Sequence, residues 1–197
     1  MHRKWTLPAL VMLAGAAGCA TLQQIAALRQ VDFSLAGTRN ARLAGVDLSR
    51  VRSARDLSAV DIARIGLAVA RKDLPLEFRL DVRGENPAAN GVTATMVRLA
   101  WSLHLNDKET ISGTLDTTLA FPPGQPTTFP LQMRLNLVQF FEGPAESLVD
   151  LAASVAGLSS DPTRISLRGV PTIDTPLGRI SYPTPITIVS RTVGGLP

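Results

Sequence analysis

The stretch of sequence that decides the fold runs from Leu76 to Leu137 and reads LEFRLDVRGENPAANGVTATMVRLAWSLHLNDKETISGTLDTTLAFPPGQPTTFPLQMRLNL. Apolar residues alternate with polar or small residues along most of this stretch, which is the period of a β-strand that buries one face. The alternation is clearest in residues 76–83, 97–105 and 129–137. We therefore expect antiparallel strands, each with one buried and one solvated face.

One turn in this stretch contains residues that would also suit a functional motif. Asn86 and Pro87 end the first strand, and Asn90-Gly91 precedes the next one. Proline has no amide hydrogen to donate and asparagine tolerates turn geometry, so turn chemistry explains Asn86-Pro87 without a ligand. A functional motif is the alternative, and we favour the structural interpretation.

The rest of the chain adds further strands and two helices to this centre. Ser58 and Asp61 form the pattern of a capping box, which marks the start of a helix. Pro75 disfavours helix in the residue before it, so we expect this helix to cover residues 58–72. This helix either covers the sheet as a lid or offers its alanine-rich side to a partner, and we favour the lid. The other expected elements are strands at residues 31–35, 42–48, 164–170, 179–182 and 186–189 and a helix at residues 142–157.

The composition fits a single globular domain. The chain has 197 residues, of which 45% are hydrophobic and 18% are charged, and this length suffices for one hydrophobic core. The formal net charge is +4, but Arg3 and Lys4 lie in a segment that we expect to be removed, which leaves 18 basic residues against 16 acidic ones. Nucleic-acid binding needs a concentrated basic face, so the balanced and dispersed charge argues against it.

The N-terminal residues have the pattern of a bacterial lipoprotein signal. Residues 1–4 carry positive charge, an apolar run extends from Leu7 to Ala17, and small residues precede Cys19. The apolar run is too short for a permanent membrane-spanning helix, which needs about 20 residues. The small residues before a lone cysteine resemble a lipobox, with Ala16 in the place where leucine is usual. We expect acylation of Cys19, and an ordinary signal peptide with an incidental cysteine is the alternative.

These features predict the location and the organisation of the protein. Acyl chains on Cys19 would hold the chain to a membrane, since each buried CH₂ group contributes about 0.8 kcal/mol. Residue 20 is alanine and not aspartate, which by resemblance to lipoprotein sorting in bacteria with two membranes favours the outer membrane, facing the periplasm. The expected organisation is a signal peptide at residues 1–18, a lipid-anchored tether at 19–30, a β-sandwich domain at 31–190 and a loose tail at 191–197.

No arrangement of residues in the sequence predicts an enzyme, a metal site or a cofactor. The chain has one cysteine and two histidines, too few for the usual zinc sites, and it has no glycine-rich phosphate loop. His104 lies on the polar face of its expected strand, so we expect it at the surface. Trp101 lies among alternating leucines, so we expect it in the core. Asp81 and Asp116 could share a sheet face, which keeps a carboxylate hydrolase as the last alternative.

The order of the segments carries a resemblance to a known family. A strand is followed by Glu85-Asn86-Pro87, by a strand that ends in Leu105-Asn106-Asp107-Lys108, by Ser112-Gly113-Thr114-Leu115, and by Pro122-Pro123-Gly124 before another alternating strand. This order resembles the WHy (water stress and hypersensitive response) domain of the late embryogenesis abundant (LEA) type 2 family. Asn86 and Pro87 match the Asn-Pro-Asn motif of that family, and Ala88 occupies its third position.

The resemblance covers about residues 31–190 and supports the fold class that the alternating strands predict. We expect an all-β domain with one or two accessory helices, a two-sheet antiparallel β-sandwich similar to immunoglobulin or fibronectin III domains.

For function, the resemblance implies a non-enzymatic, lipid-anchored envelope protein that protects proteins or membranes against desiccation or other stress. Its partners would be the membrane, through the acyl chains on Cys19, and client proteins or lipid, whereas the oligomeric state stays open. A second possibility is an interaction module that binds a protein partner or holds a lipid between the sheets. An exposed apolar patch or a large apolar cavity would favour that possibility. A hydrolase that uses the scattered carboxylates is the third.

Overall fold

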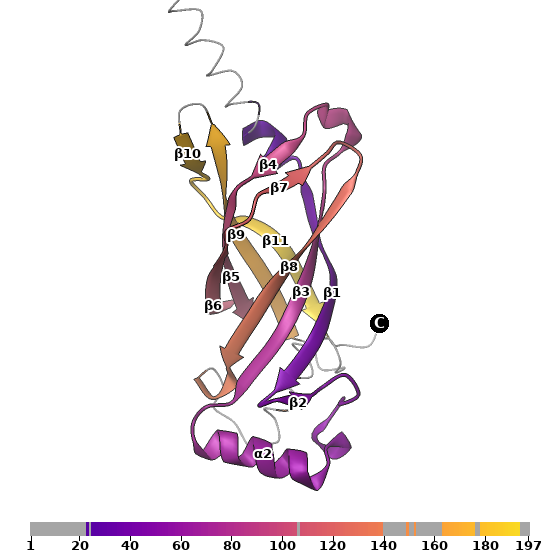
Figure 1. The fold of residues 1–197 in the computed structure, drawn as a ribbon, viewed down its shortest axis with the longest axis vertical. Coiled ribbons are helices and arrows are strands. Elements are labelled where there is room, and N and C mark those ends of the chain that lie inside the picture. The colour runs from indigo at the N-terminus through magenta and orange to yellow at the C-terminus, as the bar shows by residue number, and fades with distance from the viewer. Residues whose placement is uncertain are drawn as a thin grey trace, which may run out of the picture.

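Two antiparallel β-sheets form the body of this computed structural model, which describes residues 23, 25–105, 107–139, 149, 152, 163–175 and 178–193 (Figure 1). The first sheet has the strand order β2-β1-β3-β8, and the second has the order β10-β9-β5-β6 with β11 also paired to β9. Strands β4 and β7 pair with each other. The all-β sandwich with accessory helices that the sequence predicts is confirmed. The strand bounds are β1 Asp32–Leu43, β2 Val46–Asp47, β3 Pro75–Glu85, β4 Ala94–Met96, β5 Arg98–Leu105, β6 Lys108–Leu115, β7 Leu119–Phe121, β8 Pro126–Asn136, β9 Thr163–Thr175, β10 Gly178–Ser181 and β11 Ile186–Val193.

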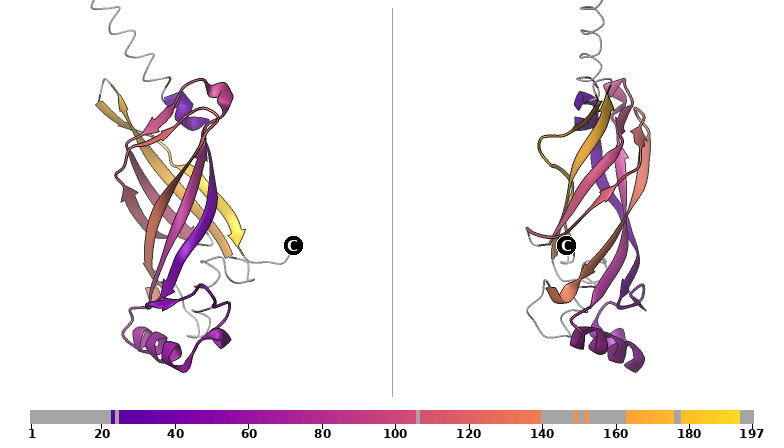
Figure 2. Two further views of the ribbon diagram at one scale, coloured as in Figure 1. Left: turned by 45° about the vertical axis from the view of Figure 1, so that its right-hand side comes forward. Right: turned by 60° about the vertical axis from the view of Figure 1, so that its left-hand side comes forward.

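The hydrophobic core lies between the two sheets, which face each other in Figure 2. Strands β3 and β8 pair without a register shift along their whole length, so their alternating apolar side chains stay on one face. The side chains that alternate along β3 are Leu76, Phe78, Leu80 and Val82, and all four are buried. Each such side chain contributes about 1.5–3 kcal/mol when it leaves water, before conformational entropy is subtracted.

Three phenylalanines form an aromatic cluster within this core. The rings of Phe33, Phe121 and Phe129 pack edge to face, with ring centroids separated by 5.6 Å, 6.5 Å and 6.3 Å. Gly84 of β3 lies directly against this cluster, and a Cβ atom at this residue would be 2.5 Å from the Phe121 ring. The close approach of the ring explains why a glycine occupies a strand position here.

Strand β1 is longer than the sequence predicts. The alternation suggests separate extended segments at residues 31–35 and 42–48, whereas β1 is continuous up to Leu43. Its pairing with β3 shifts register twice, once before Gly37 and once around Asn40, whose φ is 56°. Each shift moves the following side chains to the other face, which interrupts the alternation on which the prediction depends.

Helix α2 (Ala59–Ala70) confirms the helix expected over residues 58–72. Ser58 Oγ accepts a hydrogen bond from the Asp61 amide and the Asp61 carboxylate accepts one from the Ser58 amide, which completes the capping box. The helix lies across one end of the sandwich (Figure 1) and does not cover a sheet face, so the prediction of a lid is wrong. The short 3-10 helices are η1 Ala54–Asp56, η2 Ala88–Asn90 and η3 Leu137–Gln139.

Several expectations fall on the parts of the chain outside the described residues. These include the signal peptide at residues 1–18, Cys19 and most of the helix expected over residues 142–157, of which only Val149 and Ala152 are described, both helical and buried. Residues 25–29, in the expected tether, form a helical turn. Within the described ranges, no helix is long and apolar enough to cross a membrane.

Candidate functional site

The two ends of the sandwich are built differently, and the candidate sites lie at these ends and along the sheets between them. At the first end, called the anchor end, the segment 25–31 packs beside η2 and the residues that follow β10. At the second, called the α2 end, α2 lies beyond the ends of β1, β3 and β8 (Figure 1).

A buried asparagine organises the anchor end. Asn86 is 0% exposed, and its Nδ2 donates hydrogen bonds to the carbonyl oxygens of Val92 at 2.9 Å and Phe121 at 2.8 Å. Its Oδ1 accepts a hydrogen bond from Nδ2 of Asn90 at 2.7 Å. Pro87 follows as the N-cap residue of η2. The amide of Asn86 is thus fully occupied by other parts of the fold, in an arrangement that fixes a turn.

The same network holds the segment that follows the expected lipid anchor. Asn90 Nδ2 also donates to the Ala27 carbonyl oxygen at 3.1 Å, and Tyr182 Oη donates to the Ile25 carbonyl oxygen at 2.6 Å. Ala27 is 1% exposed, so this part of the expected tether belongs to the fold. An extended chain spans at most about 3.6 Å per residue, so the six residue steps from Cys19 to Ile25 reach at most about 22 Å.

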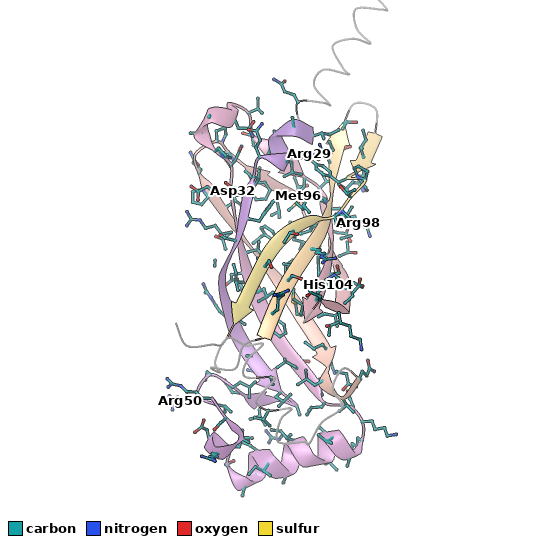
Figure 3. The ribbon with its side chains drawn as sticks, turned by 180° about the vertical axis from the view of Figure 1, so that it is seen from behind. Arg29, Asp32, Arg50, Met96, Arg98 and His104 are labelled. Carbon is teal, nitrogen blue, oxygen red and sulfur yellow. The ribbon has the colours of Figure 1, made fainter. Side chains whose placement is uncertain are left out.

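The phenol of Tyr182 is shielded from water. Burial raises the pKa of Tyr182 to about 12 from its ordinary value of 10.0, and the positive charge of Arg29 opposes part of that rise. The Arg29 guanidinium carbon lies 5.8 Å from the centroid of the Tyr182 ring, and Figure 3 shows Arg29 on the helical turn at this end. The phenol therefore keeps its proton, and its hydrogen bond to Ile25, across the neutral pH range.

His104 is buried, so the prediction of a surface histidine is wrong. It is 7% exposed, and its Nε2 lies 3.0 Å from Ser102 Oγ (Figure 3). Strand β5 lies between β6 and β9, and its register with β9 places Ser166 directly opposite His104. Neither His104 Nδ1 nor Ser166 Oγ has a hydrogen-bond partner among the described residues. A serine and histidine act as nucleophile and base when a third group orients the imidazole, and no described carboxylate does so here.

The two carboxylates considered for a hydrolase lie in different sheets. Asp81 is a residue of β3, where its two oxygens are each 2.7 Å from an Nε atom, one of Arg39 and one of Arg79. Asp116 follows β6 and lies 3.1 Å from Nε of Arg98. Each carboxylate is thus paired with arginine, and the two do not flank a common site. The described residues also contain no group of three histidine, cysteine, aspartate or glutamate side chains that could hold a metal ion.

Three hollows on the described surface are open and of mixed polarity. Their volumes are about 430, 510 and 400 Å³. The first includes Trp101, which is only partly buried and lies over Gly113, where a Cβ atom would be 2.5 Å from the ring. The third opens between β1 and β11, where Phe33 and Ile188 lie beside serine and threonine side chains. None of the three is the large apolar cavity that a lipid between the sheets would need.

Helix α2 turns its apolar side to solvent. Ile65 is its one buried residue, whereas Val60, Ile62 and Leu67 are 67%, 54% and 52% exposed. An exposed apolar face of this kind is a candidate binding surface. The sequence indicates a broad apolar side, but it does not show that this side faces away from the sandwich, because that depends on how the neighbouring segments place the helix.

The connection from α2 to β3 is fixed by a second asparagine. Asn136 Oδ1 accepts hydrogen bonds from the amides of Leu74 at 3.0 Å and Val138 at 3.3 Å, and its Nδ2 donates to the Lys72 carbonyl oxygen at 3.0 Å. The sequence indicates Asn90 only as part of a turn, and it assigns no special role to Asn136. Their place in the sequence could have identified them, because each lies where a regular element ends and backbone groups need side-chain partners.

Comparisons with known proteins assign no family to the chain. No family model and no curated protein matches it. A solution structure of a putative late embryogenesis abundant (LEA) protein is 12% identical to it with a TM-score of 0.38, over 99% of this chain and 97% of that one. A crystal structure of a protein from Archaeoglobus fulgidus is 16% identical with a TM-score of 0.33, over 62% of this chain and 88% of that one. At these TM-scores neither similarity carries an argument, and the resemblance to the LEA type 2 family stays a prediction from the sequence.

Proposed function

We propose that this chain is a non-enzymatic, lipid-anchored protein of the bacterial cell envelope that binds other surfaces through the apolar side of α2. The observation that carries this proposal is the exposure of Val60, Ile62 and Leu67, each more than half accessible to water. Covering apolar surface stabilises a complex by about 25 cal/mol per Å² removed from water, before the costs of association. A stable domain with a filled core and an uncovered apolar helix face is suited to binding.

The anchor in this proposal is Cys19, acylated in the outer membrane with the domain facing the periplasm. The support is the signal-like sequence of residues 1–18 and the packing of the segment that follows it. Because the residues from Ile25 onward are held by the sandwich, an acylated Cys19 would keep the anchor end close to its membrane. The α2 end would then be the part of the domain directed away from that membrane.

Protection of proteins or membranes during desiccation is the role that the resemblance to the LEA type 2 family implies. The α2 face supplies a physical means for it, because an apolar helix face can cover apolar surface that a partly unfolded client exposes. Protection would be one use of an interaction module that binds through α2. The same variants therefore test the protective role and the binding role.

The binding role is tested by drying a dehydrogenase that aggregates on rehydration, alone and with an equimolar amount of the purified chain. The matched variant replaces Val60, Ile62 and Leu67 with serine, which removes the apolar side of α2 and leaves Ile65 in place. We expect the wild-type chain to reduce the aggregated fraction and the triple variant to lose most of that effect. Equal aggregation with the wild-type chain and with the variant would contradict a binding role for this face.

The anchoring is tested separately in cells. Cys19→Ala removes the acylation site, and globomycin blocks cleavage of lipoprotein signal peptides. We expect the wild-type chain in the outer-membrane fraction, and an unprocessed form to accumulate after either treatment. A protein that stays membrane-bound and normally processed under both treatments would show that Cys19 is not the anchor.

A further inference from the structure

The exposed side of α2 is wide and carries no charge. Successive residues of a helix are about 100° apart, so the exposed positions from Ile62 round to Val60 span roughly 160°. Between them lie Ala59, Ala63, Gly66, Leu67 and Ala70, all exposed. A helix on the surface of a soluble domain ordinarily has the opposite arrangement, with its apolar stripe toward the core and its polar side in water.

Unpaired cations border this apolar side. Arg64 and Arg71 follow Val60 and Leu67 by four residues each, so each lies one helical turn beyond an exposed apolar side chain. Figure 3 shows Arg50 at the same end of the molecule. None of the exposed basic residues between residues 50 and 72 has an ion-pair partner among the described residues; they are Arg50, Arg52, Arg55, Arg64, Arg71 and Lys72.

Two acidic residues before and at the start of α2 accept hydrogen bonds from the backbone. The Asp56 carboxylate accepts hydrogen bonds from the amides of Arg52 at 2.9 Å and Ser53 at 3.0 Å, and these bonds lower the pKa of Asp56. The Asp61 carboxylate accepts from the Ser58 amide in the capping box of α2. These carboxylates therefore balance helix N-termini, and the arginines beside the apolar side stay available for an external anion.

We infer that α2 binds the surface of an anionic phospholipid bilayer. Helices that combine an apolar side with bordering arginine and lysine lie in the headgroup region with their apolar side chains about 5–10 Å deep, and basic residues near such a surface add to the affinity. Val60, Ile62 and Leu67 would enter the headgroup and acyl boundary, while Arg64 and Arg71 contact phosphate groups. This inference deepens the interaction role proposed above and rests on it.

A second copy of the chain fits this side less well than a bilayer does. Arg64 and Arg71 lie along one border of the apolar side, and in an antiparallel pair of α2 helices packed through these sides that border of one helix would lie along the same border of the other. Like charges at such distances repel, and no exposed acidic row borders the face to compensate. An anionic surface satisfies the apolar side and the cations together.

Vesicle co-sedimentation tests the inference with the processed chain, residues 19–197, carrying Cys19→Ser so that no acyl chain contributes. Cys19 precedes the anchor end, opposite α2, so this change leaves the helix intact. The vesicles contain phosphatidylcholine alone or with 30% phosphatidylglycerol. The apolar variant is Val60→Ser/Ile62→Ser/Leu67→Ser, and the charge variant is Arg64→Gln/Arg71→Gln. The matched control is Arg83→Gln/Arg134→Gln, which removes two exposed arginines from the first sheet.

We expect binding to the anionic vesicles that weakens as salt rises, and at least tenfold weaker binding to phosphatidylcholine alone. The charge variant should bind at least roughly tenfold more weakly than the wild-type chain. The apolar variant should lose binding, and the control should bind within twofold of the wild-type chain. Circular dichroism and urea unfolding establish that each variant is folded.

Three outcomes overturn the inference. They are equal binding to both kinds of vesicle, binding to anionic vesicles that the control variant weakens as much as the charge variant does, and absence of binding by the folded wild-type chain.

Other outcomes separate this inference from the proposed function. If the chain does not bind vesicles but the apolar variant loses its effect on the dried dehydrogenase, α2 is a protein-binding face and only the bilayer is wrong. If a concentration-dependent dimer disappears in the apolar variant, the occupant is a second copy. If none of these readouts responds to the apolar variant, the proposed function fails as well.

Discussion

The two ends of the sandwich differ in how far their helical segments are packed against the core. At the anchor end, the turn at residues 25–29 is held by side-chain hydrogen bonds from Asn90 and Tyr182, and Ala27 is almost fully buried. At the α2 end, a twelve-residue helix buries only Ile65. The first end closes the core, and the second leaves an apolar surface uncovered. The difference is that the anchor end is tied to the core by side-chain contacts, whereas most of α2 stays in contact with water.

Both ends nevertheless use an asparagine to fix the chain, and the pair allows a direct comparison. Asn86 is completely buried and makes three side-chain hydrogen bonds. Asn136 also makes three, but it is only half-buried. Because water can replace lost partners at Asn136 and not at Asn86, equal numbers of hydrogen bonds predict unequal contributions to stability.

The largest expected effect is that of Asn86→Ala. The substitution removes the side-chain donor to the buried carbonyl oxygen of Phe121 and to the part-buried carbonyl oxygen of Val92, and a buried group left unsatisfied costs about 1–3 kcal/mol. We expect the free energy of unfolding to fall by about 3–5 kcal/mol, measured by urea denaturation. Asn86→Asp keeps the size of the side chain and removes both donated hydrogen bonds, so it should be at least as destabilising. A loss below about 1 kcal/mol in Asn86→Ala would contradict the central role of this turn.

The second effect is that of Asn136→Ala. It removes the acceptor for the Leu74 amide and the donor to the Lys72 carbonyl oxygen, both at the junction between α2 and β3. We expect a loss of about 2 kcal/mol, together with faster hydrogen exchange in α2. Asn86→Ala should leave exchange in α2 unchanged at denaturant concentrations well below its midpoint. If α2 exchanges at the same rate in wild type and Asn136→Ala, this asparagine does not hold the helix.

The strands of this fold could be predicted from the sequence more completely than the two ends of the sandwich could. The alternation at residues 76–83 and 129–137 indicates β3 and β8 because every second side chain there meets the same core. It fails for His104, where the pairing of β5 with β6 shifts register between Leu103 and His104 and interrupts the alternation. Periodicity also located α2 and its capping box, but the side that faces water is decided by contacts outside the helix. Long-range partners such as Tyr182 and Ile25, 157 residues apart, leave no local pattern.

A smaller effect is expected from Tyr182→Phe, which removes the hydrogen bond to Ile25 and keeps the ring. At neutral pH we expect a loss of about 1 kcal/mol. The folded-state pKa of about 12 exceeds the unfolded value of about 10, so the unfolded chain loses its phenolic proton first as pH rises. The stabilisation is therefore complete below about pH 10 and is lost as pH rises toward about 12.

Tyr182 is the only tyrosine of the chain, so its ionisation can be followed directly. Absorbance at the tyrosinate band should give a midpoint near pH 12 in the folded protein and near pH 10 in urea. The stability difference between wild type and Tyr182→Phe should shrink across the same interval. A folded-state midpoint near pH 10 would show that the phenol is open to water and that the anchor end is not closed around it.

The smallest expected effect on the free energy of unfolding is at the α2 end, for the exposed residues of α2. Ile62→Ala and Leu67→Ala should change the free energy of unfolding by less than about 0.5 kcal/mol, because both side chains already contact water and alanine favours the helix. Ile65→Ala, on the same helix, should cost about 2–5 kcal/mol, because it leaves a cavity beneath α2. A cost above about 1 kcal/mol at Ile62 or Leu67 would mean that the folded chain itself covers this side. Near-neutral stability combined with lost binding would instead show that these residues are kept for a partner, since they contribute nothing to the fold.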